Sequence, residues 1–489
     1  DARTTLPGND RNDMKRSLLY IVIVAALGGF LFGFDSGVIS GCEKAIQAEF
    51  GLSAFWHGFI VSVALIGTVI GVFGAGAPSD RWGRRPTLWL MGVLFLVSAA
   101  GCAFTPTSKA LGPHLLGWFR FIGGLAIGGV SVVVPLYIVE ISPGRLRGRL
   151  VATNQLNIVF GILISYVSNY FVARWMAVEG GWFCSLCTWL ADLFASSPMT
   201  VEMVKWRVML GMECLPILLF MALLTTIPES PRWLVRVGRK AAAARVLARI
   251  GFAEEGKTTE QVVGEIEASL AGVSAHAAPA LFQRKYLKPI LLAFFIAFFN
   301  QVSGINAINY YAPRIFDMIF GKGSEMASLV GTMGVGTVNL VFTILAFFVI
   351  DKFGRKAMII GGSALMILMH ALVAWQLSQP QPNAAIAVAG ILGFIAFFAC
   401  SSGAVIWVYI SEVFPNAVRA KGQALGCFTH WFMCTLISWA FPAVAERAGT
   451  WAFAFFACMM AVQLVWAVFF MPETKGGTIE DIEKRLGIQ

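Results

Sequence analysis

Long apolar stretches separated by short polar segments recur along the whole chain. Twelve of them are long enough, at about 18 to 25 residues, to cross a hydrocarbon core of roughly 30 Å as a helix. They lie near residues 17–40, 55–77, 86–105, 115–139, 149–172, 208–227, 287–311, 327–350, 357–377, 385–411, 421–444 and 450–471. A closed β-barrel would instead show shorter segments of alternating hydrophobicity. The pattern therefore predicts an all-α polytopic membrane protein with twelve transmembrane helices.

The longest polar interruption divides the apolar stretches six and six, and it contains two amphipathic stretches, 239–250 and 259–270, that are typical of helices. We expect two six-helix bundles joined by a helical module on the cytoplasmic side. The expected divisions are a cytoplasmic N-terminal tail (1–16), an N-terminal bundle (17–227), a linker module (228–286), a C-terminal bundle (287–471) and a cytoplasmic C-terminal tail (472–489).

Composition and charge agree with a lipid environment. The chain is 57% apolar and 13% charged, with a net charge of +10. Most of its 37 Lys and Arg fall in the tails and in alternate connecting segments, a bias that predicts a multi-pass protein of the cell (inner) membrane with both termini cytoplasmic. The same scatter argues against nucleic acid as a partner. We expect the chain to act as a monomer in the lipid bilayer.

The chain shows no ligand cluster for a metal, no glycine-rich phosphate loop and no nucleophile constellation, so we expect neither an enzyme nor a cofactor. Cys184 and Cys187 form an isolated CxxC in a predicted outer loop. Without a second pair, this spacing leaves open whether the two thiols form a disulfide.

The two halves share an internal repeat. The segment 80–85 (DRWGRR) recurs as 351–356 (DKFGRK). Likewise, Glu140 followed by Arg147 in the first half recurs as Glu412 followed by Arg419 in the second half, about 270 residues later. Parallel six-helix repeats are a transporter architecture with the substrate site between the halves. A topology signal would explain the basic residues but not the repeated acids. We therefore interpret these residues as a cytoplasmic gate made of Asp80, Arg84, Glu140, Arg147, Asp351, Arg355, Glu412 and Arg419.

Several motifs then occur in a characteristic order: 33–35 (GFD), 135–148 (PLYIVEISPGRLRG), 228–234 (PESPRWL), 300–313 and 472–476 (PETKG). Together they resemble the sugar porter family of the major facilitator superfamily, and its D-xylose/proton symporters in particular. The resemblance implies a major facilitator fold and transport of a monosaccharide, a pentose or a hexose, by alternating access with proton symport. Facilitated diffusion and a transporter-like sugar sensor remain the alternatives.

A carboxylate within the first predicted span, Asp35, needs a justification, because a charge at the centre of a bilayer costs about 2.5 to 3.5 kcal/mol on insertion scales. Arg120, inside the fourth span, is the candidate partner. The resemblance implies that Asp35 and Arg120 form the proton-coupling pair. The alternative is a static ion pair that only fixes helix packing.

Recognition of a neutral polyol needs amides and aromatic rings more than charges. The predicted spans supply Gln155, Asn300, Gln301, Asn306, Asn309, Tyr310, Asn339, Trp407 and His430, which match sugar-contacting positions of the family. We expect Gly304 to loosen the seventh helix so that Gln301, Asn306 and Tyr310 share one face. The alternative is that these amides only join helices.

Some of these positions depart from the family. Ile162 stands where the xylose symporters have Gln and the glucose facilitators have an apolar residue, Ala404 replaces a proline that is usual in the family, and His430 replaces Gln or Asn. His430 is therefore interpreted either as a sugar donor, as a titrating group, or as a packed helix-to-helix donor.

Overall fold

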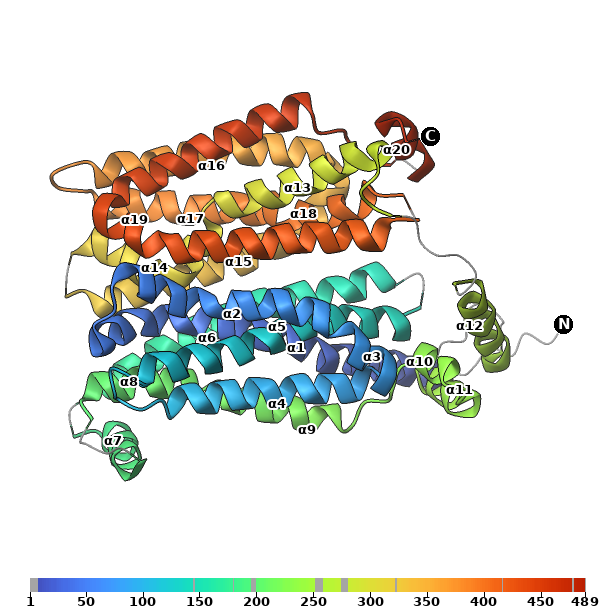
Figure 1. The fold of residues 1–489 in the computed structure, drawn as a ribbon, viewed down its shortest axis with the longest axis horizontal. Helices are drawn as coiled ribbons and strands as arrows, with labels where there is room; N and C mark the ends of the chain where they lie inside the picture. The colour runs from blue at the N-terminus through green and yellow to red at the C-terminus, as the bar shows by residue number, and fades with distance from the viewer. Residues whose placement is uncertain are drawn as a thin grey trace.

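In the computed structural model, the chain folds into two helical halves that lie side by side with a linker at one end (Figure 1). The structure describes residues 8–143, 146–178, 180–194, 199–250, 258–273, 280–321, 323–415, 417–476 and 479–488. Within these ranges, the side chains of residues 8–16, 193–194, 271–273, 351 and 479–480 are outside the description. The N-terminal half contains α1 (Gly8–Phe50), α2 (Ala54–Gly74), α3 (Gly76–Trp82), α4 (Arg84–Ala103), α5 (Gly112–Ile141), α6 (Arg147–Met176), α7 (Trp182–Phe194), α8 (Val201–Gly211) and α9 (Cys214–Leu224).

The C-terminal half follows a short 3₁₀ turn, η1 (Arg284–Tyr286). It contains α13 (Leu287–Val302), α14 (Ile305–Phe320), α15 (Glu325–Phe353), α16 (Arg355–Leu377), α17 (Ala384–Cys400), α18 (Ser402–Glu412) and α19 (Arg419–Phe469). Three pairs, α8 with α9, α13 with α14 and α17 with α18, each form one interrupted span. Helix α19 changes direction at Ala448 (φ −159°, ψ 53°), so its 51 residues supply two spans.

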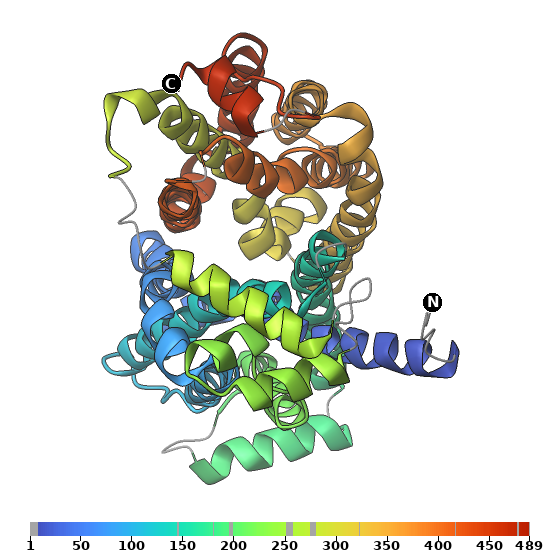
Figure 2. The same ribbon diagram turned by 90° about the vertical axis from the view of Figure 1, so that its right-hand side faces the viewer.

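Within the described residues, eleven helical segments are long and apolar enough to cross a membrane, and the break in α19 makes twelve crossings. The crossings agree with the twelve apolar stretches of the sequence, and the predicted all-α, twelve-helix fold is confirmed. Helix α7 differs from them: it is short and lies across the bundle axis at the edge of the N-terminal half (Figures 1 and 2). Cys184 and Cys187 are free thiols on this helix.

The linker helices α10 (Pro231–Arg236), α11 (Lys240–Arg249) and α12 (Thr259–Val273) lie at the same end of the bundle as the C-terminal helix α20 (Ile479–Leu486) (Figure 1). We call this the linker end, and the opposite end the far end. The two halves contact each other through α1 with α14, α2 with α19 and α6 with α15.

Candidate functional site

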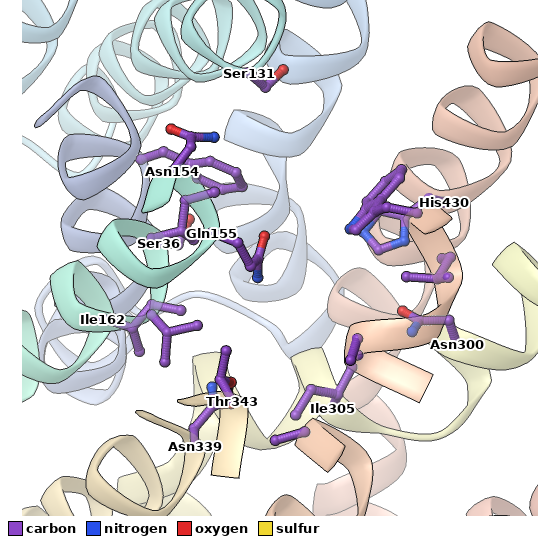
Figure 3. A pocket seen from close by; sticks show the side chains of 18 of the residues that line it. Ser36, Ser131, Asn154, Gln155, Ile162, Asn300, Ile305, Asn339, Thr343 and His430 are labelled. Atoms are coloured by element: carbon purple, nitrogen blue, oxygen red, sulfur yellow. The ribbon is translucent and has the colours of Figure 1, made fainter. Parts of the chain in front are cut away.

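A cavity of about 540 Å³ lies between the two halves. Figure 3 shows side chains of the N-terminal half, such as Gln155, facing Asn300 and His430 of the C-terminal half. The cavity extends to Gly148 and Val151 in the first turns of α6, at the linker end. All nine residues predicted to bind substrate line it: Gln155, Asn300, Gln301, Asn306, Asn309, Tyr310, Asn339, Trp407 and His430.

The break between α13 and α14 places three amides against the cavity. Gly304 adopts φ +88°, which favours glycine, and a Cβ there would lie 2.6 Å from the Phe456 ring. The expected loosening of the helix at Gly304 is therefore present. Across the break, Asn306 Nδ2 donates to Gln301 Oε1 at 2.6 Å, and Gln301 Nε2 donates to Asn300 Oδ1 at 3.0 Å. The amides form a continuous chain whose members all line the cavity.

His430 extends this chain. A ring nitrogen of His430 lies 3.0 Å from Gln301 Nε2, and the imidazole lies 4.9 Å from the Trp407 ring, centroid to centroid. Because the amide nitrogen is a donor, the ring nitrogen facing it accepts, which requires a neutral imidazole in this arrangement. His430 is thus oriented by Gln301 on one side and by Trp407 on the other.

The opposite wall comes mainly from α6 and includes polar groups that the sequence analysis did not select. Asn154 and Ser36 line the cavity beside Gln155 (Figure 3). Asn154 Oδ1 and Asn309 Oδ1 are buried and accept no hydrogen bond from the part of the chain that the structure describes. Buried acceptors of this kind are available to a ligand that brings donors. Ile162 makes one region of this wall apolar.

A buried pair of oppositely charged side chains lies beside the cavity. Arg120 Nη1 donates to Asp35 Oδ1 at 2.6 Å, and both side chains are 2% exposed. The structure therefore brings together the predicted pair from α1 and α5. The Tyr310 hydroxyl, which lines the cavity, lies close enough to interact electrostatically with both charges.

A third member, Glu213, was missed by the sequence analysis. It lies between α8 and α9, is 2% exposed, and is close enough to Asp35 for the two carboxyl groups to interact electrostatically. Arg120 is also within electrostatic reach of Glu213. Glu213 falls inside the predicted span 208–227, so the rule that drew attention to Asp35, a carboxyl group within a span, would have found it. We call Asp35, Arg120 and Glu213 the buried triad.

At the linker end, the repeated motifs form equivalent ion pairs in the two halves. Arg84 donates to both oxygens of Glu140 at 2.8 Å, and Arg355 donates to Glu412 at 2.9 Å. Asp80 lies 3.3 Å from Arg84 and 2.8 Å from Arg236 of α10. The Arg84–Glu140 and Arg355–Glu412 pairs lie within one half each, and Asp80 connects its half to the linker, so none of these contacts joins the two halves.

Two other candidate gate residues, Arg147 and Arg419, are not in the ion pairs described above. Arg147 is exposed at the start of α6, and Arg419 donates to the Phe414 carbonyl at 3.3 Å. Asp351 belongs to α15, but its side chain lies outside the described residues. Among the described contacts, Glu140 at the end of α5 pairs with Arg84, and Glu412 at the end of α18 pairs with Arg355. Neither acid pairs with the arginine that follows it in the sequence.

Two further carboxylates complete the repeat by capping helices. Glu229 accepts from the backbone N–H groups of Arg84 and Arg85, and Glu473 accepts from those of Arg355 and Lys356, all at 2.9 to 3.0 Å. Burial raises the pKa of the Glu229 carboxyl group, whereas the less buried Glu473 has a lowered pKa, because backbone N–H donors outweigh its burial. These caps tie the linker and the C-terminal segment to α4 and α16.

The far end is closed by contacts between the halves. Trp439 Nε1 of α19 donates to the Phe55 carbonyl at 3.1 Å, and Lys44 of α1 forms an ion pair with Asp317 of α14. The cavity therefore reaches the linker end, whereas these contacts join the two halves at the far end. In the described residues, no group of His, Cys, Asp and Glu side chains is arranged to hold a metal ion.

Two six-helix halves with an amide-containing cavity between them define a multi-pass membrane transporter of the major facilitator type. The family described as "Sugar (and other) transporter" matches residues 21–486, and the chain belongs to it. The chain is 35% identical to the D-xylose-proton symporter of Escherichia coli (strain K12), covering 95% of this chain and 94% of that protein. It is 33% identical to the arabinose-proton symporter of Bacillus subtilis (strain 168), covering 98% of each.

The structural comparison agrees with this assignment. The inward open conformation of the xylose transporter XylE from E. coli matches with a TM-score of 0.80 at 33% identity, over 96% of this chain and 99% of that one. The overall arrangement of the two halves in this chain is thus similar to that of a transporter open on one side.

Proposed function

We propose that this chain carries a neutral monosaccharide together with a proton across the inner membrane by alternating access. The observation that carries the proposal is the position of the buried triad directly beside a cavity lined with amides and aromatic rings. The similarity to proton symporters of xylose and arabinose supports the same reading.

The lining supports a neutral polyol as the substrate class. Among the described residues that line the cavity there is no Asp, Glu, Lys or Arg. The amides of Gln155, Gln301 and Asn306 provide donors and acceptors for hydroxyl groups, and the Trp407 ring offers an apolar surface to the C–H face of a sugar. The names of the relatives favour a pentose or a hexose.

Charge balance supports one coupled proton. If both carboxyl groups of the triad are ionised, two negative charges face one guanidinium, and the triad carries a net charge of −1. It becomes neutral when one proton is bound. Because an uncompensated charge is unfavourable in a dry protein interior, proton binding is coupled to whether water reaches the triad. A change in which end is open then loads or releases the proton.

Alternating access follows from the two ends. The far-end contacts must break, and the paired residues at the linker end must approach across the halves, for the cavity to face the other side. We place the linker end and both termini in the cytoplasm, following the distribution of basic residues. The route lies between two halves of one chain, which is consistent with function as a monomer.

The substrate is tested by a thermal-stability screen of pentoses, hexoses and polyols on the purified protein, because a ligand of the folded state raises its stability. We expect one monosaccharide group to raise the melting temperature. In Gln301→Ala the affinity should fall about 5- to 150-fold, because the substitution leaves partners of the amide unpaired. Unchanged sugar affinity in both Gln301→Ala and Trp407→Ala would place the site elsewhere.

A further inference from the structure

A second cluster of buried ionisable groups lies at the far end, away from the triad and the cavity. Glu43 of α1 and His57 of α2 both have side chains that are 0% exposed, and His57 Nε2 lies 3.0 Å from Glu43 Oε2. Neither residue lines the cavity. Complete burial of an acid and a histidine side by side is unusual for residues that only pack, since an unpaired charge there is unfavourable.

The same carboxylate joins the two halves. Arg314, on α14 of the C-terminal half, donates to Glu43 through Nε at 3.1 Å and through Nη2 at 2.8 Å. This bidentate geometry is the strongest form of an arginine–carboxylate contact. Glu43 is therefore shared between an imidazole of its own half and a guanidinium of the other half.

The surroundings of His57 define its electrostatics. Glu43 of α1 and Arg314 of α14 are the charged groups next to it, and the Tyr311 ring of α14 lies 6.0 Å away, centroid to centroid. Glu446 of α19 lies 3.8 Å from Arg314, on the side away from Glu43, and is 45% exposed. Helix α19 packs tightly on the start of α2, because a Cβ at Gly58 would lie 2.1 Å from the Trp439 carbonyl.

In this closed arrangement, the charges of Glu43 and Arg314 balance each other if His57 is neutral. A proton on His57 would add a positive charge next to Arg314 in a buried site, where charges are poorly screened. An imidazolium and a guanidinium would then compete for one carboxylate. When the far end opens, Arg314 moves away with its own half, and water reaches His57.

We propose that Glu43, His57 and Arg314 form a proton-binding lock: the far end is held shut while His57 is neutral, and binding of a proton to His57 releases Arg314 and opens the far end. The orientation of the lock relative to the two compartments rests on the proposed function. With the far end outside the cell, external acid opens the gate through which the triad takes up its own proton. The proton then acts at two places, on the gate and in the coupling.

The lock is tested by hydrogen–deuterium exchange of the full-length protein in nanodiscs, without sugar, at roughly pH 5.5 and pH 7.5, between which the proton activity changes about 100-fold. Exchange is corrected for the intrinsic effect of pH and compared between far-end peptides around Glu43 and His57 and peptides at the linker end. If the open state binds the proton about tenfold more tightly, the open fraction rises by up to about tenfold at acid pH, and local exchange rises with it. All variants are also made in an Asp35→Asn background, so that titration of the triad does not contribute.

The expected result is acid-stimulated exchange at the far end of the Asp35→Asn protein, which His57→Gln abolishes by keeping the lock closed at both pH values. Glu43→Gln and Arg314→Gln should give high exchange at both pH values; either one suffices if the other fails to fold. His114, exposed at the same end on α5, provides the matched control, and His114→Gln should keep the acid response.

Three outcomes overturn the lock: no acid response in the parent protein, an unchanged response in His57→Gln, or loss of the response in His114→Gln. Because the measurement needs no sugar, a failure of the lock is distinguishable from a failure of sugar transport.

Discussion

Replacement of Asp35 by Asn isolates the coupling step. The substitution removes one carboxyl group from the buried triad and leaves Glu213 near Arg120. One carboxylate and one guanidinium are neutral without a proton, so the substituted triad no longer needs to bind and release one in each cycle. The fold should survive, because the buried guanidinium keeps an acidic partner. We expect transport to continue but to lose its link to the proton gradient.

The magnitude follows from the charge balance. One proton per sugar makes each pH unit of gradient worth about 1.4 kcal/mol, or about tenfold in sugar accumulation. With a gradient of about two pH units, proteoliposomes containing the wild-type protein should accumulate sugar about 100-fold, and those with Asp35→Asn should reach equal concentrations on both sides. Counterflow of labelled sugar at equal pH should persist in the variant.

Two results would refute this reasoning. If Asp35→Asn still accumulated sugar as the wild type does, the triad would not be the coupling site. If the variant lost accumulation and counterflow equally while remaining folded, Asp35 would have a structural role in the transport cycle. Arg120→Ala serves as the contrasting variant, because it leaves two carboxyl groups buried without a cation and should lower stability by about 3 to 5 kcal/mol.

Three further substitutions follow from the geometry. Glu213→Gln should uncouple transport in the same way as Asp35→Asn, since it leaves one carboxylate with Arg120; retained accumulation in proteoliposomes would exclude Glu213 from coupling. Gly304→Ala should destabilise the protein by about 2 to 4 kcal/mol, through its positive φ and the contact with Phe456, and a melting temperature equal to wild type would contradict this. Glu473→Gln should lower the melting temperature at neutral pH. Because the pKa of Glu473 in the folded protein lies below its ordinary value of 4.5, this difference should be lost as the pH falls through that lower pKa, and a difference independent of pH would argue against the capping role.

The hydrophobic pattern predicted the fold well, because each crossing must satisfy its backbone hydrogen bonds within its own helix. The breaks were harder to foresee. Gly304 could be anticipated from its place among polar residues in an apolar span, and the break at Ala448 falls between the predicted spans 421–444 and 450–471, whereas the break at Ser401 depends on packing between helices.

The candidate substrate residues could be selected from the sequence because amides inside apolar spans are few and have a recognisable chemistry. The sequence did not indicate which charged residues form ion pairs with one another. Arg147 follows Glu140 closely in the sequence, but the fold pairs Glu140 with Arg84, which begins the neighbouring helix. The far-end lock joins Glu43 to Arg314 across 271 positions, and no local pattern indicates that contact. Local periodicity specifies which residues face inward, and the assembly of the halves decides which of them meet.

The coupling of sugar transport to proton transport is tested most directly by measuring both movements together in proteoliposomes that contain the wild-type protein, starting without a pH gradient. Addition of the sugar identified by the binding screen should drive proton movement in the same direction as the sugar, with about one proton for each sugar molecule. Sugar movement with no accompanying proton would contradict coupling through the buried triad, and the absence of any sugar movement would contradict transport itself.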